Sequence, residues 1–304
     1  MPTTKEATYE NISKLVTQNL KADVNIHTHK EPSQTVKLVL SAESDDNLDK
    51  VWTSWKVSDR SGVLTINDTS SGFGGANFSG NGMMVISGAI VINGVDVTSQ
   101  FASGGAAAHK ELPKLKIDMP ESTALKLGVT AGQCNIGDIA APFGFRIRGS
   151  AVVCAQTIHG DVDANISGPG DFSAEKIVGN HLDASVSGSG DISIEDIEAK
   201  HASVKVSSSG DVRLGRGSVE RIDASTSGSG DMKFDVCANS AKLTVSGSGD
   251  IYVKEVTGDV QHTASGSGKI KVGNRPDIKK DRASAGQGSS IIISGNGISI
   301  RSKL

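Results

Sequence analysis

The sequence predicts an all-β protein whose larger part is a parallel β-helix, a solenoid of short strands with about 20 residues in each coil. Three observations support this fold class. A Gly- and Ser-rich turn motif recurs at a nearly constant spacing, apolar and polar residues alternate around it, and glycine is abundant while aromatic residues are scarce. The chain of 304 residues has 36 glycines but only 2 Trp, 2 Tyr and 7 Phe, which suits a core built from thin, repeated layers.

The repeated motif has the form Ser-Gly-Ser-Gly-Asp and recurs, with small changes, along the second half of the chain. Its copies occupy residues 167–171, 187–191, 207–211, 227–231, 246–250 and 265–269. The first four copies are evenly spaced, the last two each start one position earlier than that spacing would give, and such a nearly fixed period is typical of a solenoid. No helical period accompanies the motif, and the leucine and asparagine signature of leucine-rich repeats is absent, so we interpret the repeat as β-helix coils.

Strands are expected on both sides of each turn because apolar and polar residues alternate there with a period of two. The first inward column after the turn contains Phe172, Ile192, Val212, Met232, Ile251 and Ile270. A later inward column is predicted at Ile158, Ile177, Ile197, Cys237 and Val256. The coil with residues 215–218 breaks this later column and is expected to bulge. The pattern extends back to residues 132–139 and forward to a last coil at 291–298, so we assign the β-helix to residues 111–300 and a tail to residues 301–304.

An N-terminal β region is expected over residues 1–68. Residues 24–28, 36–40 and 63–66 alternate as strands, and the acidic start of residues 45–52 predicts a short helix or turn. Residues 69–110 are predicted to be an insertion, in which Gly-, Ser- and Ala-rich stretches flank a hairpin with its turn at Asn93 and Gly94. An isolated hairpin is marginal in water, so we expect it to dock on the rod or on a neighbouring molecule.

Composition and charge exclude several classes of protein. The 31 basic and 34 acidic residues give a net charge of −3, which argues against nucleic acid as a partner. There is no run of about 18 apolar residues, so no membrane span is expected. A hydrophobic content of 37% is too high for a disordered chain, and the glycines lack the strict three-residue period of collagen.

The three cysteines form no CxxC motif, so no zinc site is predicted. Cys134 and Cys237 fall in inward columns and are expected to be small core residues. Cys154 falls in an outward position and is the candidate for a disulfide between chains, with an inert free thiol as the alternative.

A ladder of aspartates is expected at one corner of the solenoid, formed by Asp171, Asp191, Asp211, Asp231 and Asp250. Carboxylates about 5 Å apart repel one another, so we expect each to accept hydrogen bonds from turn N–H groups or serine hydroxyls. A row of Ca²⁺ sites is the alternative, although the nine-residue calcium repeat is absent. The Gly-rich turns lead into strands rather than helices, which excludes phosphate-binding loops. We predict no catalytic residue, no cofactor and no metal.

Histidines mark one outward column, in which His181, His201 and Arg221 follow each other at intervals of one repeat. Two stacked imidazoles could bind a metal, or could repel each other when protonated near pH 6. The alternative is an ordinary solvated face. His181 and His201 are therefore our candidates for a pH-sensitive column.

The two ends of the chain indicate where in the cell the protein is expected. Residues 1–20 lack the apolar segment of a secretory signal, and Ser302, Lys303 and Leu304 match the peroxisomal address of eukaryotes. We therefore expect an intracellular protein, located in the peroxisome if a eukaryotic cell reads this tripeptide. The alternatives are a vacuole or other storage compartment, or the bacterial cytoplasm.

The recurring Ser-Gly-Ser-Gly-Asp-Ile after alternating strands resembles the head GIN domain of putative auto-transporter adhesins, as do residues 46–51, 62–66 and 117–120. The resemblance covers most of the chain apart from residues 69–110. It implies a right-handed β-helix and an adhesin role. An intracellular fungal relative of this family assembles into protein crystals, and the missing secretory signal makes the present chain similar in outline.

From these features we expect a non-enzymatic structural protein that self-associates, forming ordered intracellular assemblies or crystals, with itself as partner. The alternative is an adhesin-like module for carbohydrate or surface partners. A carbohydrate-active enzyme is the third hypothesis. β-Helical lyases and hydrolases need carboxylates and basic residues in a groove, and only residues 213–216 interrupt the coils enough to form one.

Overall fold

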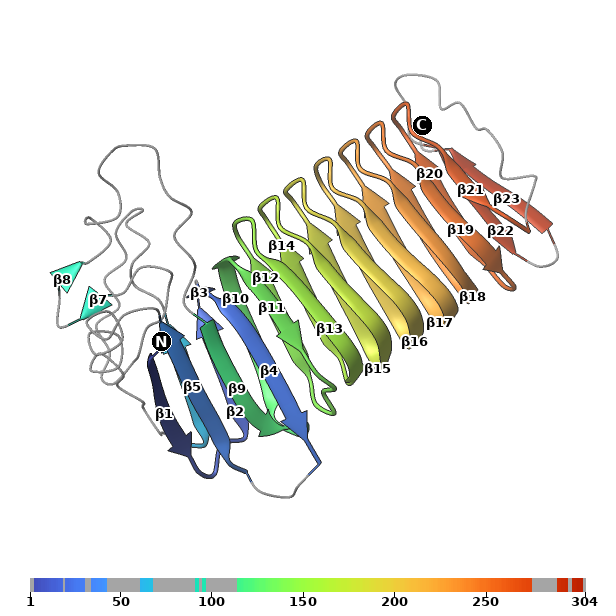
Figure 1. Cartoon of the computed structure of the whole chain (residues 1–304). Coiled ribbons are helices and arrows are strands. Elements are labelled where there is room, and N and C mark those ends of the chain that lie inside the picture. Colours follow the sequence, from blue (N-terminus) through green and yellow to red (C-terminus); the bar gives the residue numbers. More distant parts are fainter. Residues whose placement is uncertain are drawn as a thin grey trace. The chain divides into compact units, whose positions relative to one another are not determined.

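The structure, a computed structural model, consists of strands and turns (Figure 1). It describes residues 3–18, 20–30, 34–42, 61–67, 91–92, 95–96, 114–274, 289–294 and 297–302, and within these ranges there is no helix. The predicted all-β solenoid is therefore confirmed. The helix or turn expected at residues 45–52 lies outside the described residues. The chain divides into two compact units, Met1–Cys154 and Ala155–Leu304, which are considered in turn.

One set of strands in the first unit combines both strand directions. Its strands are β1 (Thr3–Tyr9), β5 (Val36–Ala42), β9 (Lys114–Pro120), β4 (Asp23–His29) and β11 (Gln133–Ile136), in order of pairing. The β1–β5 and β5–β9 pairs are antiparallel, whereas β9–β4 and β4–β11 are parallel. Parallel pairing in this set thus begins at β9 and β4, and β5 and β1 extend the sheet by antiparallel pairing.

The second set of strands in this unit is parallel throughout. It contains β6 (Val63–Asn67), β2 (Lys14–Gln18), β10 (Ala124–Ala131) and β12 (Phe143–Ile147), in order of pairing, and β3 (Leu20–Lys21) also pairs with β10. Alternate residues of both sets are fully buried, among them Leu15, Leu38, Leu64, Ile117 and Leu127. The period-two pattern of the sequence is therefore that of strands with one face in a core.

The predicted hairpin in the insertion is present as a short antiparallel pair. Strands β7 (Val91–Ile92) and β8 (Val95–Asp96) flank residues 93–94, with Ile92 opposite Val95. This spacing is that of a two-residue turn, as expected for Asn-Gly. The remainder of the insertion lies outside the described residues, and docking of the hairpin stays a prediction.

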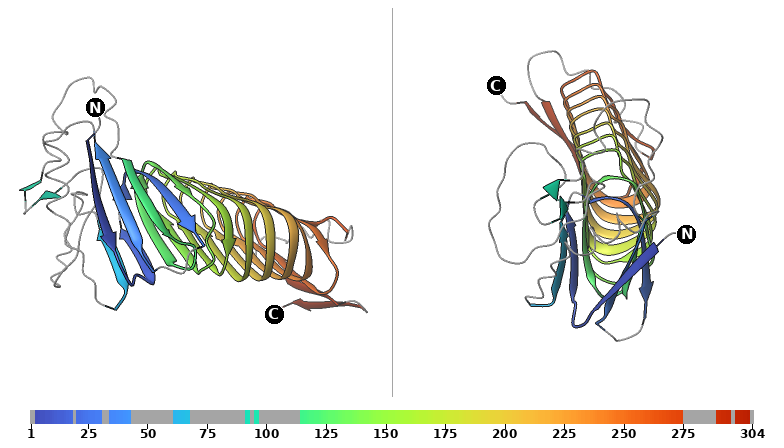
Figure 2. Two further views of the ribbon diagram at one scale, coloured as in Figure 1. Left: turned by 60° about the horizontal axis from the view of Figure 1, so that its bottom comes forward. Right: turned by 60° about the vertical axis from the view of Figure 1, so that its left-hand side comes forward.

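The second unit is a regular stack of coils (Figures 1 and 2). Its parallel strands are β13 (Val152–His159), β14 (Val162–Ile166), β15 (Phe172–Val186), β16 (Ile192–Val206), β17 (Val212–Thr226), β18 (Met232–Val245), β19 (Ile251–Val256), β20 (Val260–Ala264) and β21 (Ile270–Val272). Phe172 pairs with Ile192, Ile192 with Val212, and Val212 with Met232, so each position lies beside the equivalent position of the next coil. From Met232 to Ile251 and from Ile251 to Ile270 the coil is one residue shorter.

Stacked apolar residues form the core of this unit. Fully buried side chains recur at the predicted positions, as in Phe172, Ile192, Val212, Met232 and Ile251. A single coil cannot bury such a face by itself, so stability comes from the neighbours above and below. The few aromatic residues follow from this geometry, because each layer has only about 4.8 Å of depth.

Glycine is required at the turn because the coils approach each other closely there. A Cβ atom on Gly230 would collide with the carbonyl oxygen of Gly210, and one on Gly210 would collide with that of Gly190. These glycines do not have positive φ, so the reason is contact between layers rather than backbone conformation. Gly217 lies within β17 rather than at the turn, and its φ of 132° is in the left-handed region.

The structure contradicts the predicted position of Cys237 and confirms the predicted bulge. Cys237, expected in the core, is exposed, and Val236 is fully buried in its place, so that prediction is wrong. The pairing of β18 with both neighbours shifts in register just before Cys237, because the shorter coil has one residue fewer. The bulge expected at residues 215–218 is confirmed by the register shift between Leu214 and Ser218.

The expected last coil at residues 291–298 is also wrong. Strands β22 (Ser289–Ser294) and β23 (Gly297–Ser302) form an antiparallel hairpin, and β22 is antiparallel to β20. The chain therefore reverses after β21 and covers part of the final coil instead of adding another.

Candidate functional site

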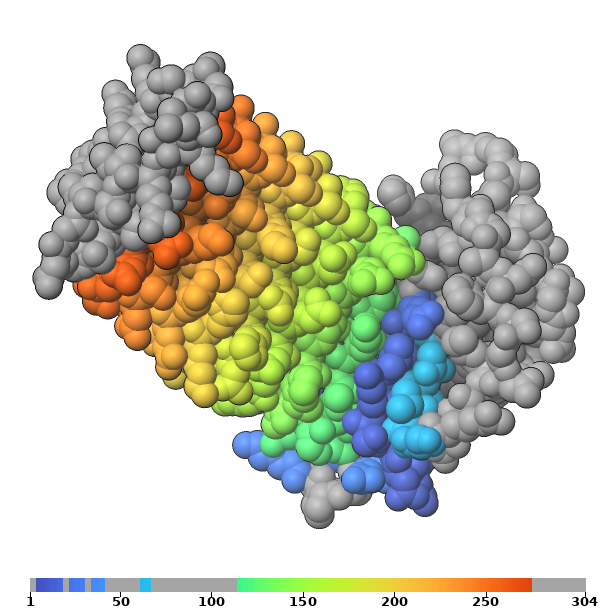
Figure 3. Space-filling model, turned by 180° about the vertical axis from the view of Figure 1, so that it is seen from behind, coloured from blue at the N-terminus to red at the C-terminus, as the bar shows by residue number. Residues whose placement is uncertain are grey.

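From β15 to β19 the outward surface is built from equivalent positions of successive coils. The turns at residues 187–191, 207–211 and 227–231 are five residues long and alike, and no long loop projects between β15 and β19. Figure 3 shows the coils as adjoining bands on one side of the unit. Outward side chains at equivalent positions therefore form columns, and these columns are the candidate sites.

The aspartate column bonds each coil to the next. Oδ1 of Asp171 accepts a hydrogen bond from the backbone N–H of Asp191 at 2.9 Å, and Oδ1 of Asp191 accepts one from Asp211 at 2.8 Å. The series continues at 2.7 Å from Asp211 to Asp231, from Asp231 to Asp250 and from Asp250 to Lys269. These contacts are those expected for carboxylates that accept turn N–H groups.

The ladder also explains how like charges tolerate this proximity. Each carboxylate faces a backbone dipole that is fixed by the next coil, and charge-assisted hydrogen bonds of this kind are stronger than neutral ones. The described ranges contain no group of three or more His, Cys, Asp or Glu side chains placed to hold a metal ion. The arrangement is thus that of a structural element, and the Ca²⁺ alternative gains no support.

The histidine column is formed as the repeat predicts. His181 lies opposite His201 in the register of β15 and β16, and His201 lies opposite Arg221 in that of β16 and β17. The two imidazole rings are 6.1 Å apart between centroids and nearly perpendicular. His181 is exposed and His201 is half-buried.

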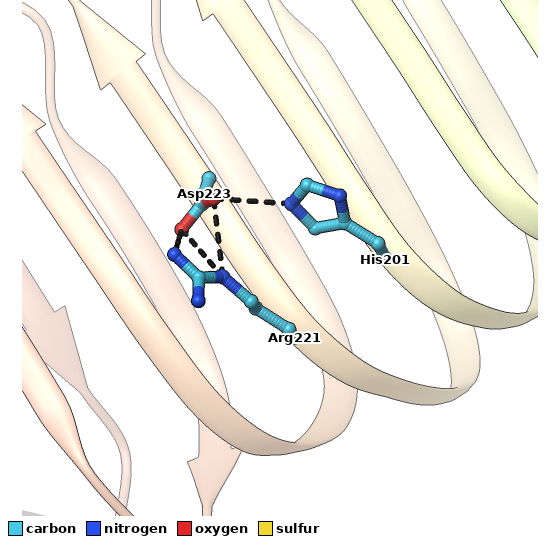
Figure 4. A network of polar contacts seen from close by, with 3 residues as sticks. All are labelled: His201, Arg221 and Asp223. Carbon is cyan, nitrogen blue, oxygen red and sulfur yellow. Dashed lines mark hydrogen bonds and ion pairs between the residues drawn. The ribbon is translucent and has the colours of Figure 1, made fainter.

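Asp223 joins His201 and Arg221 in one polar network (Figure 4). His201 Nε2 lies 3.0 Å from Asp223 Oδ2, and Arg221 donates from Nε and Nη2 to the same carboxylate at 3.1–3.2 Å. Partial burial raises the pKa of Asp223, but the hydrogen bonds from Arg221 and His201 lower it by more, so its pKa lies below the usual value.

This network changes the expected chemistry of the column. A proton on His201 would face a carboxylate at 3.0 Å, so attraction to Asp223 opposes repulsion from His181. Asp223 was not among the sequence candidates. The signal was present, because Asp223 lies two residues after Arg221 and so points to the same side of the strand.

A cationic column with one tyrosine runs along another outward position. Arg213 lies opposite Lys233, Lys233 opposite Tyr252, and Tyr252 opposite Lys271 in successive registers. Asp235 contacts Lys233 at 3.1 Å and Arg213 at 3.9 Å. In the sequence these positions appeared only as polar residues between apolar columns.

The interruption at residues 213–216 is closed by contacts between coils. Arg216 Nη2 donates to Asp196 Oδ2 at 2.7 Å, and this pairing holds the pKa of Asp196 below its usual value. A Cβ atom on Gly215 would collide with the carbonyl oxygen of Glu195, so the backbones touch there. At this interruption the coils thus touch through their backbones and through an exposed ion pair.

The cysteines occupy three different environments. Cys134 is fully buried, and burial raises its pKa to about 12. Cys154 is half-buried at its outward position, and all three thiols are free within this chain. Cys237 Sγ lies 3.5 Å from Glu255 Oε2, and desolvation together with this contact raises the pKa of its thiol. A disulfide from Cys154 to another chain stays a prediction.

The C-terminal candidates are only partly described. Ser302 ends β23, opposite Ser289, and Lys303 and Leu304 lie outside the described residues. The described part of the chain contains no helix with the length and apolarity that crossing a membrane requires.

Comparison with protein families bears out the resemblance over the regular coils. Residues 162–276 match the family described as "Putative auto-transporter adhesin, head GIN domain". No protein with a curated description matches the chain. The comparisons give no support to a relation with the crystal-forming fungal protein.

Solved structures share the fold at low sequence identity. A putative adhesin from Parabacteroides distasonis is 19% identical, with a TM-score of 0.58 over 90% of this chain and 97% of that one. A putative adhesin from Parabacteroides merdae is 19% identical, with a TM-score of 0.57 over 89% and 95%. A putative lipid binding protein from P. distasonis is 18% identical, with a TM-score of 0.52 over 89% of each chain.

Proposed function

We propose that the protein is a non-catalytic, adhesin-like binding module that recognises a surface-bound carbohydrate through the outward faces of its coils. The observation that carries this proposal is the coincidence of two features. The residues that match the adhesin family, 162–276, are those whose outward side chains form uninterrupted columns from coil to coil. Such columns suit a partner that is itself extended and repetitive.

The carboxylates of these coils support binding rather than catalysis. Hydrolysis of a glycosidic bond needs one carboxyl group as acid and another as base or nucleophile, held on either side of the sugar. Here Asp191 and Asp211 accept backbone N–H groups, and Asp196 and Asp223 pair with arginines. Each of these carboxylates is held in place by the fold and lies on a flat face.

Self-assembly is the competing expectation from the sequence, and no contact in the described residues favours it over binding. The two functions differ in what they require of the purified chain. A binding module recognises its partner as a dispersed protein, whereas an assembly protein forms particles when its concentration rises.

The test is an array of neutral and acidic glycans probed with the purified full chain, together with light scattering over a hundredfold range of concentration. We expect saturable binding to a subset of glycans, competed by the same glycan in solution, from a protein whose mass stays constant. Absence of binding to every glycan would contradict the proposal. Growth into ordered particles without binding would favour the structural role instead.

A further inference from the structure

The column of Arg213, Lys233, Tyr252 and Lys271 points to a more definite partner. We infer that this face binds an acidic polysaccharide, a polymer of carboxylate-bearing sugars, aligned with the stacking direction of the coils. The inference rests on the proposed binding function and names its ligand class. It is argued from the register, the charges and the aromatic ring of the column.

The register places the four side chains on one line. Successive pairings join Arg213 to Lys233, Lys233 to Tyr252, and Tyr252 to Lys271, each one coil further along. Parallel strands lie about 4.8 Å apart, so three steps span roughly 14 Å. The column has one side chain per coil, and a polysaccharide has one pyranose ring per repeat. Successive side chains of the column can therefore contact successive sugars.

The charges of the column are only partly compensated. Arg213 and Lys233 keep 62% and 54% of their side-chain surface exposed and share one carboxylate, that of Asp235. Lys271 is exposed, as is Lys254, which follows Tyr252 by two residues and points to the same side. Asp211, Asp231 and Asp250 precede the column by two residues on the same side, and their carboxylates accept backbone N–H groups. Together with Lys269, the strip carries five cations and four carboxylates in a chain whose net charge is −3.

Tyr252 supplies an aromatic surface within the cationic column. The ammonium group of Lys271 lies 5.3 Å from the centroid of its ring. Its hydroxyl would be 3.2 Å from a Cβ atom on Gly273, so a glycine leaves room for the ring to extend towards the next coil. An amphipathic ring beside cations can stack on the apolar face of a sugar while the cations meet its carboxylates.

The column fits an acidic glycan better than a nucleic acid. Binding to DNA or RNA relies on a broad basic surface that neutralises many phosphates. Here the cations occupy a narrow strip, with Asp235 and the turn aspartates beside them. A narrow strip with an aromatic group suits a single polymer of spaced carboxylates.

The experiment measures binding of polygalacturonate to the full chain by calorimetry at 20 and 200 mM salt, with dextran as the neutral polymer. Arg213→Gln/Lys233→Gln should weaken binding about tenfold, since two charged contacts are lost. Asp235→Asn should strengthen binding about threefold, because it removes the competing carboxylate. The matched control is Lys205→Gln/Lys242→Gln, which removes the same charge from exposed positions in other columns and should leave the affinity unchanged.

The outcomes separate this inference from the function on which it rests. Salt-sensitive binding with the variant effects just given supports the acidic glycan. Glycan binding that both double variants weaken equally, or that is as strong for dextran, overturns the column but leaves a binding module. Equal affinity for duplex DNA overturns the ligand class. Failure to bind any glycan on the array overturns both. Circular dichroism of each variant shows whether it has folded.

Discussion

At the scale of single residues, the turn aspartates show how a charged side chain can add to the backbone hydrogen bonds between coils. The carboxylate of each aspartate accepts a hydrogen bond from the backbone N–H of the equivalent residue in the next coil, at 2.7–2.9 Å. The hydrogen bond thus links layers in the stacking direction, as the strand ladders do. The sequence showed that the carboxylates repeat, and turn chemistry indicated that they accept N–H groups. The atom that each contacts required the structure.

Replacement of Asp211 tests this role. Asp211→Ala leaves the N–H of Asp231 without its acceptor and should lower the free energy of unfolding by about 1 kcal/mol. Asp211→Asn keeps an oxygen acceptor and removes one of the stacked charges, so it should lose less. Urea unfolding of both variants measures the difference. Equal losses for Ala and Asn would show that the charge, rather than the acceptor, matters.

The cysteines provide a second prediction at this scale. In the native protein an alkylating reagent at pH 8 should modify Cys154 and the exposed Cys237 but not Cys134, whose burial raises its pKa to about 12. Mass spectrometry of the native protein should therefore find two labels, and a third only in urea. The raised pKa of Cys237 should slow its labelling. Modification of Cys134 in the folded protein would contradict the assigned core.

The Asp223 network predicts how stability depends on pH. Because its pKa in the folded state lies below the ordinary value of 3.8, the ionised form is stabilised by folding. This contribution is complete above the ordinary pKa and is lost as the pH falls through the lowered one. Asp223 faces His201, Arg221 and, in the next coil, Lys242.

Comparison of Asp223→Asn with the wild type measures this contribution. The variant should be less stable by about 1 kcal/mol or less at pH 6, since the carboxylate is partly exposed, and the difference should shrink as the pH falls below the ordinary pKa of 3.8. Asp183→Asn, which removes an exposed carboxylate from the same outward column, is the matched control. A difference for Asp223→Asn that stays constant as the pH is lowered through the acid range would exclude the ion pairs as its cause.

At the scale of elements, the strands could be predicted wherever the repeat is visible. The inward columns from Phe172 to Ile270 follow from the apolar–polar alternation, because every coil repeats the same pattern. The position of Cys237 could not be predicted, because a coil that is shorter than its neighbours does not reveal where its missing residue lies. The structure places the shift just before Cys237, and Val236 therefore turns inward.

The direction of the last strands was missed for a different reason. Alternating apolar residues in 289–302 suit a parallel coil and an antiparallel hairpin equally well. The distinguishing signal was the Gly-Asn pair at residues 295–296, since two such residues between alternating runs are typical of a hairpin. The sequence places Asp223 beside Arg221, but its contact with His201 required the structure, because these two residues are 22 positions apart rather than one repeat apart.

Deletion of a complete coil tests the modularity of these elements. Removing residues 192–211 joins Asp191 to Val212, which repeats the native junction of Asp211 with Val212. We expect a folded protein with a smaller dependence of unfolding free energy on urea, because less surface is buried. Deleting residues 192–201 removes half a coil, so that Ser207 and Arg216 fall at the inward positions of Ile197 and Val206, and it should abolish cooperative unfolding. If both deletions behave alike, the coils are not interchangeable units.

At the scale of the whole molecule, both units contain parallel strands that stack from coil to coil, but their other strands differ. In Met1–Cys154 antiparallel strands join the parallel coils, whereas in Ala155–Leu304 the coils repeat until a hairpin ends them. The repeat and the alternation were sufficient to predict the solenoid. The outward columns could not be assigned a role from the sequence, because a position on the surface carries no constraint that a sequence pattern would display.

This freedom of the surface has a consequence for how such a protein can change over time. The apolar side chains of the core point inward, whereas the side chains of the proposed binding column point outward, so these two sets share no positions. A substitution at Arg213 or Tyr252 can alter recognition without disturbing Val212 or Val253 beside it. The fold thus separates what must be inherited intact from what can diversify, and related chains can acquire different ligands on a constant scaffold.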